Sequence, residues 1–80
     1  MVMQLVWVTE ARYLADYKMM LVFNDGLQKT FDFSKLLNEN QKAYDRLKDM
    51  AVFKNFELDG WTVTWLNGRL DIAPEYLYNN

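Results

Sequence analysis

The sequence predicts a single α+β domain over residues 1–80, in which an antiparallel sheet of about six short strands carries one main helix and a C-terminal helical turn. Short apolar runs and runs with period-two alternation occur in both halves of the chain, and turn signals separate them. Only one longer stretch has apolar residues at helical spacing, and it lies between the two groups of strands. The expected order is therefore β-β-β-α-β-β-β, and 80 residues leave room for one domain at most.

The first group of strands is expected to form an antiparallel meander. Its members are three runs of β-forming residues: 5–8, 18–23 and 28–33. The run at 5–8 is apolar throughout, which suits a strand that is buried on both faces. The mixed residues 9–16 are expected to connect it to the second strand. Asn24-Asp25-Gly26 predicts the next turn, with a positive φ at Gly26.

The helical pattern begins at Gln41, from which apolar residues recur three or four positions apart up to Ala51. Charged side chains fall on the opposite side and indicate an exposed face. Exposed ion pairs contribute only about 0.3–0.5 kcal/mol each, so the apolar stripe is expected to decide this helix. Upstream, Ser34 is expected to cap a short apolar helical turn, because its hydroxyl can accept from the first backbone N–H groups.

The second group of strands begins after the helix. Residues 56–58 form a short strand, and Asp59-Gly60 signals a hairpin. The alternating strand that follows places Trp61 and Trp65 on one face. Aromatic side chains at period two in a small sheet usually fill the interior, so both indoles are expected in the core.

The C-terminal stretch contains the strongest turn signal of the chain. Asn67-Gly68 predicts a tight primed turn, because both residues tolerate a positive φ. Residues 70–73 can return as the partner strand, and Pro74 ends it because proline cannot donate to a ladder. Proline also suits the first position of a helical turn, where Glu75 would interact favourably with the helix dipole.

The composition excludes several kinds of site. The chain has no Cys and no His, which rules out a disulfide framework, a thiolate metal site and a histidine general base. Nine Lys and Arg against eleven Asp and Glu give a net charge of −2, whereas a phosphate-backbone binder usually has a basic face. The chain contains no apolar run of membrane-spanning length and no secretion signal at its start. We therefore expect a cytoplasmic protein without a membrane partner.

The string WLNGRLDIAPEYLY at residues 65–78 resembles the C-terminal signature of a bacterial family catalogued as domain of unknown function 2442. The residues that carry this structural motif are Trp65, Asn67, Gly68, Asp71, Pro74, Glu75 and Tyr78. Residues 22–26 (VFNDG) are similar to the early hairpin of the family, and residues 31–34 (FDFS) to its strand-to-helix junction. The chain departs from the family pattern in two ways. Leu66 stands where proline is frequent, and Arg69-Leu70 occupies a place that many members fill with one residue.

The resemblance covers nearly the whole chain and implies no particular activity. Genes of the family often look paired with those of another small uncharacterised family, in a layout similar to that of toxin–antitoxin modules. The resemblance therefore implies a small protein as partner, and an antitoxin-like role in which this chain neutralises it. That implication rests on association alone.

Two groups of side chains are candidates for chemistry. Asp71 and Glu75 could form a carboxylate pair for acid–base work or for a metal, but a turn acceptor and a helix-start residue explain them more simply. Trp61 and Trp65, with tyrosines near the C-terminus, could stack nucleobases, but their neighbours are acidic and neutral rather than basic. We therefore predict no catalytic, cofactor-binding or metal-binding residue, and no small-molecule substrate.

One helix and one helical turn can cover one face of such a sheet, which leaves apolar surface on the other face. Contiguous apolar surface of this kind marks an interface more often than it is left free. The candidate interface residues are Trp7, Met19, Met20 and Val22. The sequence thus favours a non-enzymatic protein-interaction module that forms a homodimer, most simply with two-fold symmetry, or binds another small protein. The alternatives are a nucleic-acid-associated accessory or regulatory protein and, more remotely, a carboxylate-based hydrolase.

Overall fold

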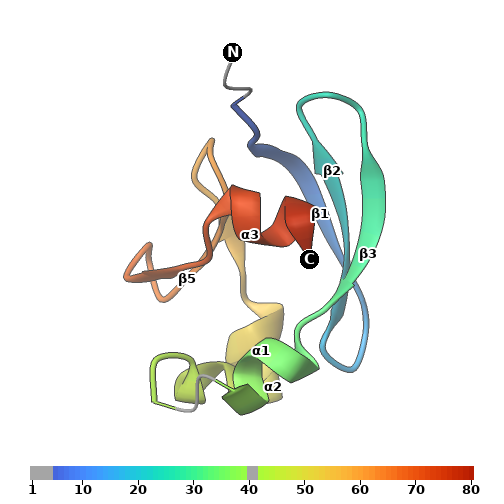
Figure 1. The fold of residues 1–80 in the computed structure, drawn as a ribbon. Helices are drawn as coiled ribbons and strands as arrows, with labels where there is room; N and C mark the ends of the chain where they lie inside the picture. The colour runs from blue at the N-terminus through green and yellow to red at the C-terminus, as the bar shows by residue number, and fades with distance from the viewer. Residues whose placement is uncertain (1–4, 40–41) are drawn as a thin grey trace.

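The computed structural model describes residues 5–39 and 42–80 of the chain. It has an α+β fold with two small antiparallel sheets of three strands each, and not the single six-stranded sheet expected from the sequence (Figure 1). The strands are β1 (Val8–Ala15), β2 (Lys18–Phe23) and β3 (Gln28–Asp32) in the first sheet, and β4 (Glu57–Leu58), β5 (Val63–Trp65) and β6 (Leu70–Asp71) in the second. The helices are α1 (Ser34–Glu39), the 3-10 helix η1 (Asp45–Lys48), α2 (Met50–Lys54) and α3 (Pro74–Asn79).

The two sheets meet near the start of β1. The backbone N–H of Val8 donates to the carbonyl of Trp61 at 2.9 Å, two residues before β5 begins. Strand β5 starts only at Val63 because the carboxylate of Asp59 accepts the backbone N–H groups of Trp61 and Thr62. Those two residues are therefore held in a turn, and the predicted strand from 61 to 65 is shortened to three residues.

The first strand begins where the predicted strand ends. Strand β1 covers Val8–Ala15, so the expected strand at 5–8 and the expected connection at 9–16 were wrong. Its register with β2 shifts at two places, between Val8 and Glu10 and between Tyr13 and Ala15. Such bulges change the phase of side-chain alternation, which removes the period-two signal from the sequence. The strand predicted at 18–23 is confirmed as β2. Its pairing with β3 has no register shift, so its side-chain alternation is kept.

The main helix expected over residues 41–51 is replaced by two shorter helices; Gln41 lies outside the described residues. Between η1 and α2, Asp49 has an extended backbone with φ −74° and ψ 114°. Its carboxylate accepts the backbone N–H of Ala51 at 3.0 Å, so Asp49 is the N-cap of α2. Aspartate stabilises a helix start more than a helix interior, which explains the break.

Two further polar contacts position α1 and η1. Ser34 is the first residue of α1, and its N–H donates to the carboxylate of Asp32 at 2.9 Å, so the expected cap at Ser34 is replaced by an acceptor two residues earlier. This bond also lowers the pKa of Asp32. The hydroxyl of Tyr17, in the turn before β2, donates to the carbonyl of Lys48 at the end of η1.

The core is built around three aromatic rings from three different elements. Phe33, Phe53 and Trp65 are all fully buried, with ring centroids between 5.4 and 6.0 Å apart. The indole N–H of Trp65 donates to the carbonyl of Phe53 at 2.9 Å, so the largest buried side chain also has its polar atom satisfied. This cluster joins the second sheet to α2 and to the residue that follows β3.

Helix α3 packs on the first sheet (Figure 1). The ring of Tyr78 contacts that of Phe23 edge-on, with the ring centroids 5.0 Å apart, and the ring centroids of Tyr76 and Phe31 are 6.2 Å apart. Pro74 occupies the start of the helix and Glu75 lies in its first turn, as expected. Within the described residues, the longest helices have six residues, and none is long and apolar enough to span a bilayer.

Candidate interaction surface

Trp7 and Trp61 meet at the junction of the two sheets. Together with Leu5 and Leu58, two exposed leucines that precede them by two and three residues, they form what we call the tryptophan patch. The indoles of Trp7 and Trp61 stack with centroids 5.8 Å apart and planes 17° apart. Trp61 remains 40% exposed and Trp7 is half-buried, so the pair presents aromatic surface to solvent. Sequence reasoning placed Trp61 in the core beside Trp65, and this was wrong for Trp61 only.

The turn between β2 and β3 fixes the backbone of Leu5 and Trp7. The side-chain oxygen of Asn24 accepts the N–H of Trp7 at 2.9 Å, and its amide nitrogen donates to the carbonyl of Leu5 at 3.1 Å. The backbone N–H of Asn24 donates in turn to the carbonyl of Trp7 at 3.0 Å. A single asparagine therefore holds this non-strand segment beside the sheet, and the Val8 bond to the Trp61 carbonyl fixes its other side.

Asp59 fixes the other indole of the patch. Its carboxylate oxygen accepts the N–H of Trp61 at 2.9 Å and the N–H of Thr62 at 2.8 Å, while its own N–H donates to the Thr62 carbonyl at 3.2 Å. These bonds, that of Thr62 first, hold the pKa of the Asp59 carboxyl below its usual value. The Thr62 hydroxyl also donates to the carbonyl of Ile72 at 2.6 Å, which ties this turn to the segment before α3.

A second aspartate lies next to Asn24. The carboxylate of Asp25 accepts the hydroxyl of Tyr78 at 2.5 Å and the N–H of Leu27 at 2.9 Å. The tyrosine bond is the main cause of a lowered pKa at Asp25, and the same bond raises the pKa of Tyr78. The N-terminal segment of the patch is therefore held between the turn that contains Asp25 and the turn that contains Asp59. Both carboxylates are ionised at neutral pH, because hydrogen bonds lower their pKa values.

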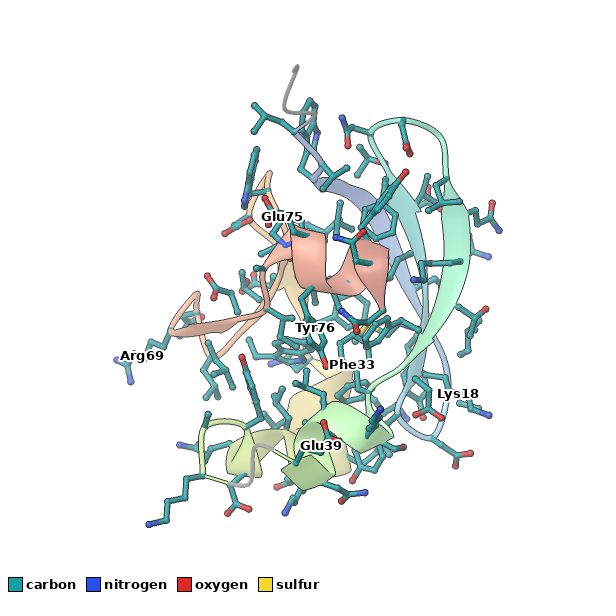
Figure 2. All side chains as sticks on the ribbon, viewed as in Figure 1. Lys18, Phe33, Glu39, Arg69, Glu75 and Tyr76 are labelled. Atoms are coloured by element: carbon teal, nitrogen blue, oxygen red, sulfur yellow. The ribbon has the colours of Figure 1, made fainter. Side chains whose placement is uncertain are left out.

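Basic and acidic residues are unevenly distributed along the chain, and the segments that contain the patch residues have acidic but no basic side chains. Residues 5–11, 19–28, 55–68 and 70–80 contain no Lys or Arg. Their acidic side chains are Glu10, Asp25, Glu57, Asp59, Asp71 and Glu75. All nine basic residues lie in the remaining segments. Figure 2 shows Glu75 on the side of the molecule that carries the N-terminal segment, whereas Lys18 lies at the far end of the first sheet.

The outer face of the first sheet, turned away from α3, contains part of the expected interface. Met20 and Val22 lie in its central strand, opposite Arg12 and Glu10 of β1, and both are partly exposed. Met19 points to the other face and is fully buried in the core, so we remove it from the interface expectation. The interface itself stays a prediction.

The family-signature residues have structural surroundings. Trp65 is buried, and the turn after it forms as expected, with φ of 59° at Asn67 and 83° at Gly68. The N–H of Arg69 donates to the carbonyl of Leu66 at 3.2 Å and closes this turn. Leu66 itself has a positive φ of 57°, which proline cannot adopt.

The two acids of the signature do not share a pocket with other ligands. Asp71 lies in β6 opposite Thr64 and Glu75 lies in the first turn of α3, and both are exposed. Over residues 5–39 and 42–80, no group of three or more acidic side chains lies close enough to hold a metal ion. An open depression of about 550 Å³ lies between β3, α1 and α3, and its lining includes Lys35, Glu39 and Tyr76. Figure 2 labels the last two of these side chains.

The fold and surface define a small α+β domain with two antiparallel sheets and an exposed aromatic pair. Residues 8–80 match the family described as "Protein of unknown function (DUF2442)". The chain therefore belongs to the DUF2442 family, and the match covers nearly its whole length. Neither the curated proteins nor the solved structures that were compared contain a significant match.

Proposed function

We propose that this chain is a small, non-enzymatic protein-interaction module of the cytoplasm, which binds another protein through the tryptophan patch. The observation that carries the proposal is the stacked pair of Trp7 and Trp61, of which Trp61 is 40% exposed. Tryptophan is strongly enriched among residues that dominate binding energy at protein interfaces. A domain of this size has little apolar surface to spare, so the exposure of an indole is costly unless a partner covers it.

The patch is also organised before any partner arrives. Asn24 and Asp59 fix the backbones of the two indole residues by hydrogen bonds, and the rings hold each other by stacking. A rigid aromatic pair loses little side-chain freedom on binding, which favours affinity. The carboxylates with lowered pKa values, Asp25, Asp32 and Asp59, bind backbone N–H groups or a tyrosine, which is a structural use of these acids. These features support a binding surface more than a catalytic one.

The partner that the family resemblance suggests is a small protein encoded nearby, which this chain would neutralise in the manner of an antitoxin. We do not extend the proposal to nucleic acid, because the exposed indoles lie in segments that hold no Lys or Arg. A single-strand binder combines its stacking rings with a basic groove.

Site-specific photo-crosslinking tests this proposal. A photoreactive phenylalanine analogue at Leu58 should form one discrete protein adduct in native lysate, and the same analogue at Leu14 should not. Both side chains are exposed and apolar, so Leu14 is a matched control. With the captured protein purified, Trp61→Ala should weaken its binding by about 30-fold or more, as for an interface hot spot. Identical adducts from both positions, or full affinity of Trp61→Ala, would contradict the proposal.

Self-association is a second candidate, and one observation favours it. Met20 and Val22 are partly exposed in the middle of the outer sheet face, which α3 does not cover (Figure 1). A two-fold dimer could bury them against the same residues of a second copy. Sedimentation velocity at tens of micromolar should then show a dimer that Met20→Lys converts to a monomer and that Leu27→Lys, in the exposed turn, leaves intact. A clean monomer of the unmodified chain would contradict the dimer.

A further inference from the structure

The tryptophan patch lies in segments of the chain whose charged residues are all acidic, and this composition favours a partner of positive charge. Trp7 and Trp61 belong to segments that contain no Lys or Arg. Asp59 precedes Trp61 by two residues and binds its N–H, and Asp25 adjoins the asparagine that binds Trp7. Each of the two backbone segments that present the indoles is therefore bonded to a turn that contains an aspartate.

Those two carboxylates remain ionised over the whole neutral range. Each accepts hydrogen bonds that favour its charged form, from Tyr78 at Asp25 and from two backbone N–H groups at Asp59. Glu10 and Glu75 are also exposed, and both lie in segments that contain no Lys or Arg. A negative potential around an exposed indole favours cations at the ring face, because the face of the aromatic quadrupole is itself negative.

We infer that the occupant of the tryptophan patch is a basic segment of a partner protein, with an arginine or lysine side chain packed on the exposed face of Trp61 and neighbouring cations facing Asp25 and Asp59. This inference rests on the proposed function and specifies the chemistry of the partner. Charge complementarity of this kind speeds the encounter and makes binding depend on salt. Arginine fits best, because its planar cation stacks on an indole and pairs with carboxylates at the same time.

The indole N–H signals in nitrogen-15 NMR spectra provide the test. Trp7, Trp61 and Trp65 each give one signal, and Trp65 is an internal control because it is fully buried and bonded to the Phe53 carbonyl. The probes are three short peptides that alternate glycine with arginine, glutamine or glutamate. The arginine peptide should shift the Trp7 and Trp61 signals and leave that of Trp65 in place. The effect should weaken steeply as salt is raised, and the other two peptides should have no effect.

Variants separate the cation–aromatic contact from the charge. Trp61→Leu keeps an apolar side chain but removes the ring face, and should weaken the arginine peptide about two- to five-fold. The double variant Glu10→Gln, Glu75→Gln should also weaken it. The control, Glu39→Gln with Asp45→Asn, removes the same charge from exposed positions in the basic-rich segments and should leave the affinity unchanged. Equal effects of the two double variants would overturn the inference.

The failures of the two proposals are distinguishable. Equal shifts of Trp7 and Trp61 with all three peptides would overturn the basic-segment inference and leave the patch as a polypeptide-binding surface. The absence of any shift with the arginine peptide would overturn the basic-segment inference as well, while photo-crosslinking at Leu58 tests the surface independently.

A second copy of this chain could also present its basic segments to the patch. A salt-sensitive rise in mass without peptide, lost in Trp61→Leu, would assign the patch to self-association and overturn the inference.

Discussion

The hydroxyl of Tyr78 donates a hydrogen bond of 2.5 Å to the carboxylate of Asp25, across 53 residues of sequence. This bond joins the last helix to the turn between β2 and β3, and the same turn holds the N-terminal segment through Asn24. The Tyr78 ring also packs on Phe23, the last residue of β2, which directly precedes Asn24. The contact therefore connects the C-terminal family signature to the patch that we propose as the binding surface.

Tyr78→Phe should lower the free energy of unfolding while leaving the fold intact. The ring and its contact with Phe23 are retained, so only the hydroxyl bond to Asp25 is lost. Urea denaturation followed by circular dichroism measures the change. Tyr44→Phe serves as the control, since Tyr44 is a half-buried tyrosine on another element. An unchanged midpoint in Tyr78→Phe would show that the bond contributes nothing in solution.

The free energy of unfolding should fall in acid, because three aspartates make hydrogen bonds that favour their ionised form in the folded state. The pKa values of Asp25, Asp32 and Asp59 are lowered in the folded state from the usual 3.8. A lowered pKa gives stability that is fully present above the unfolded value and is lost as pH falls through the folded value. Denaturation midpoints should therefore be level near neutral pH and fall below about pH 3.8. Asp59→Asn keeps the acceptor oxygen and removes the titration, so it should flatten this fall, whereas the exposed Asp45→Asn should not.

The opposite sign applies to Tyr78 at alkaline pH. Its pKa is raised from the usual 10.0 because its hydroxyl donates to the Asp25 carboxylate. The bond therefore contributes stability below pH 10 that is lost as pH rises through the raised pKa of the folded state. A pH titration of the tyrosine absorbance should show one late-titrating group, and Asp25→Ala should remove it. A spectrum in which no tyrosine titrates later than in Asp25→Ala would contradict this prediction.

The sequence predicted the elements whose signals are local. Strand β2 pairs without interruption on its β3 side and keeps its alternation, and Gly26 and Gly68 adopt the positive φ that their turn signals indicated. Pro74 and Glu75 start α3 because the preferences of proline and glutamate at a helix start depend on neighbouring residues alone.

The elements that were mispredicted depend on side chains that compete with the ladder or the helix. Asp59 and Asp49 accept backbone N–H groups, which shortened one strand and split one helix. Two register shifts in β1 removed its alternation. The pairing of Trp7 with Trp61 was not predictable, because it joins segments far apart in the chain and the alternation at 61–65 indicated that Trp61 is buried. The Asp-Gly signal at 59–60 was the one hint that Trp61 borders a turn.

Trp65→Phe should be far more destabilising than Trp61→Phe. The smaller ring leaves a void in a fully buried site and deprives the Phe53 carbonyl of its donor, which together should cost about 3 kcal/mol. Trp61 is 40% exposed and its N–H takes no part in the core, so the same change there should cost at most about 1 kcal/mol. Urea denaturation of both variants measures the difference. Equal costs would contradict the assignment of Trp65 to the core and Trp61 to the surface.

Leu66→Pro should destabilise this chain even though proline is frequent at this position of the family signature. The backbone φ of Leu66 is +57°, whereas the proline ring fixes φ near −65°. The substitution must therefore rebuild the turn that Arg69 closes on Leu66, at a cost of more than about 1 kcal/mol. Asn67→Gly is the matched control, because glycine accepts the positive φ of 59° at that position and should change stability by less than about 0.5 kcal/mol. If Leu66→Pro were as stable as the unmodified chain, this turn would have to adopt a different shape in solution.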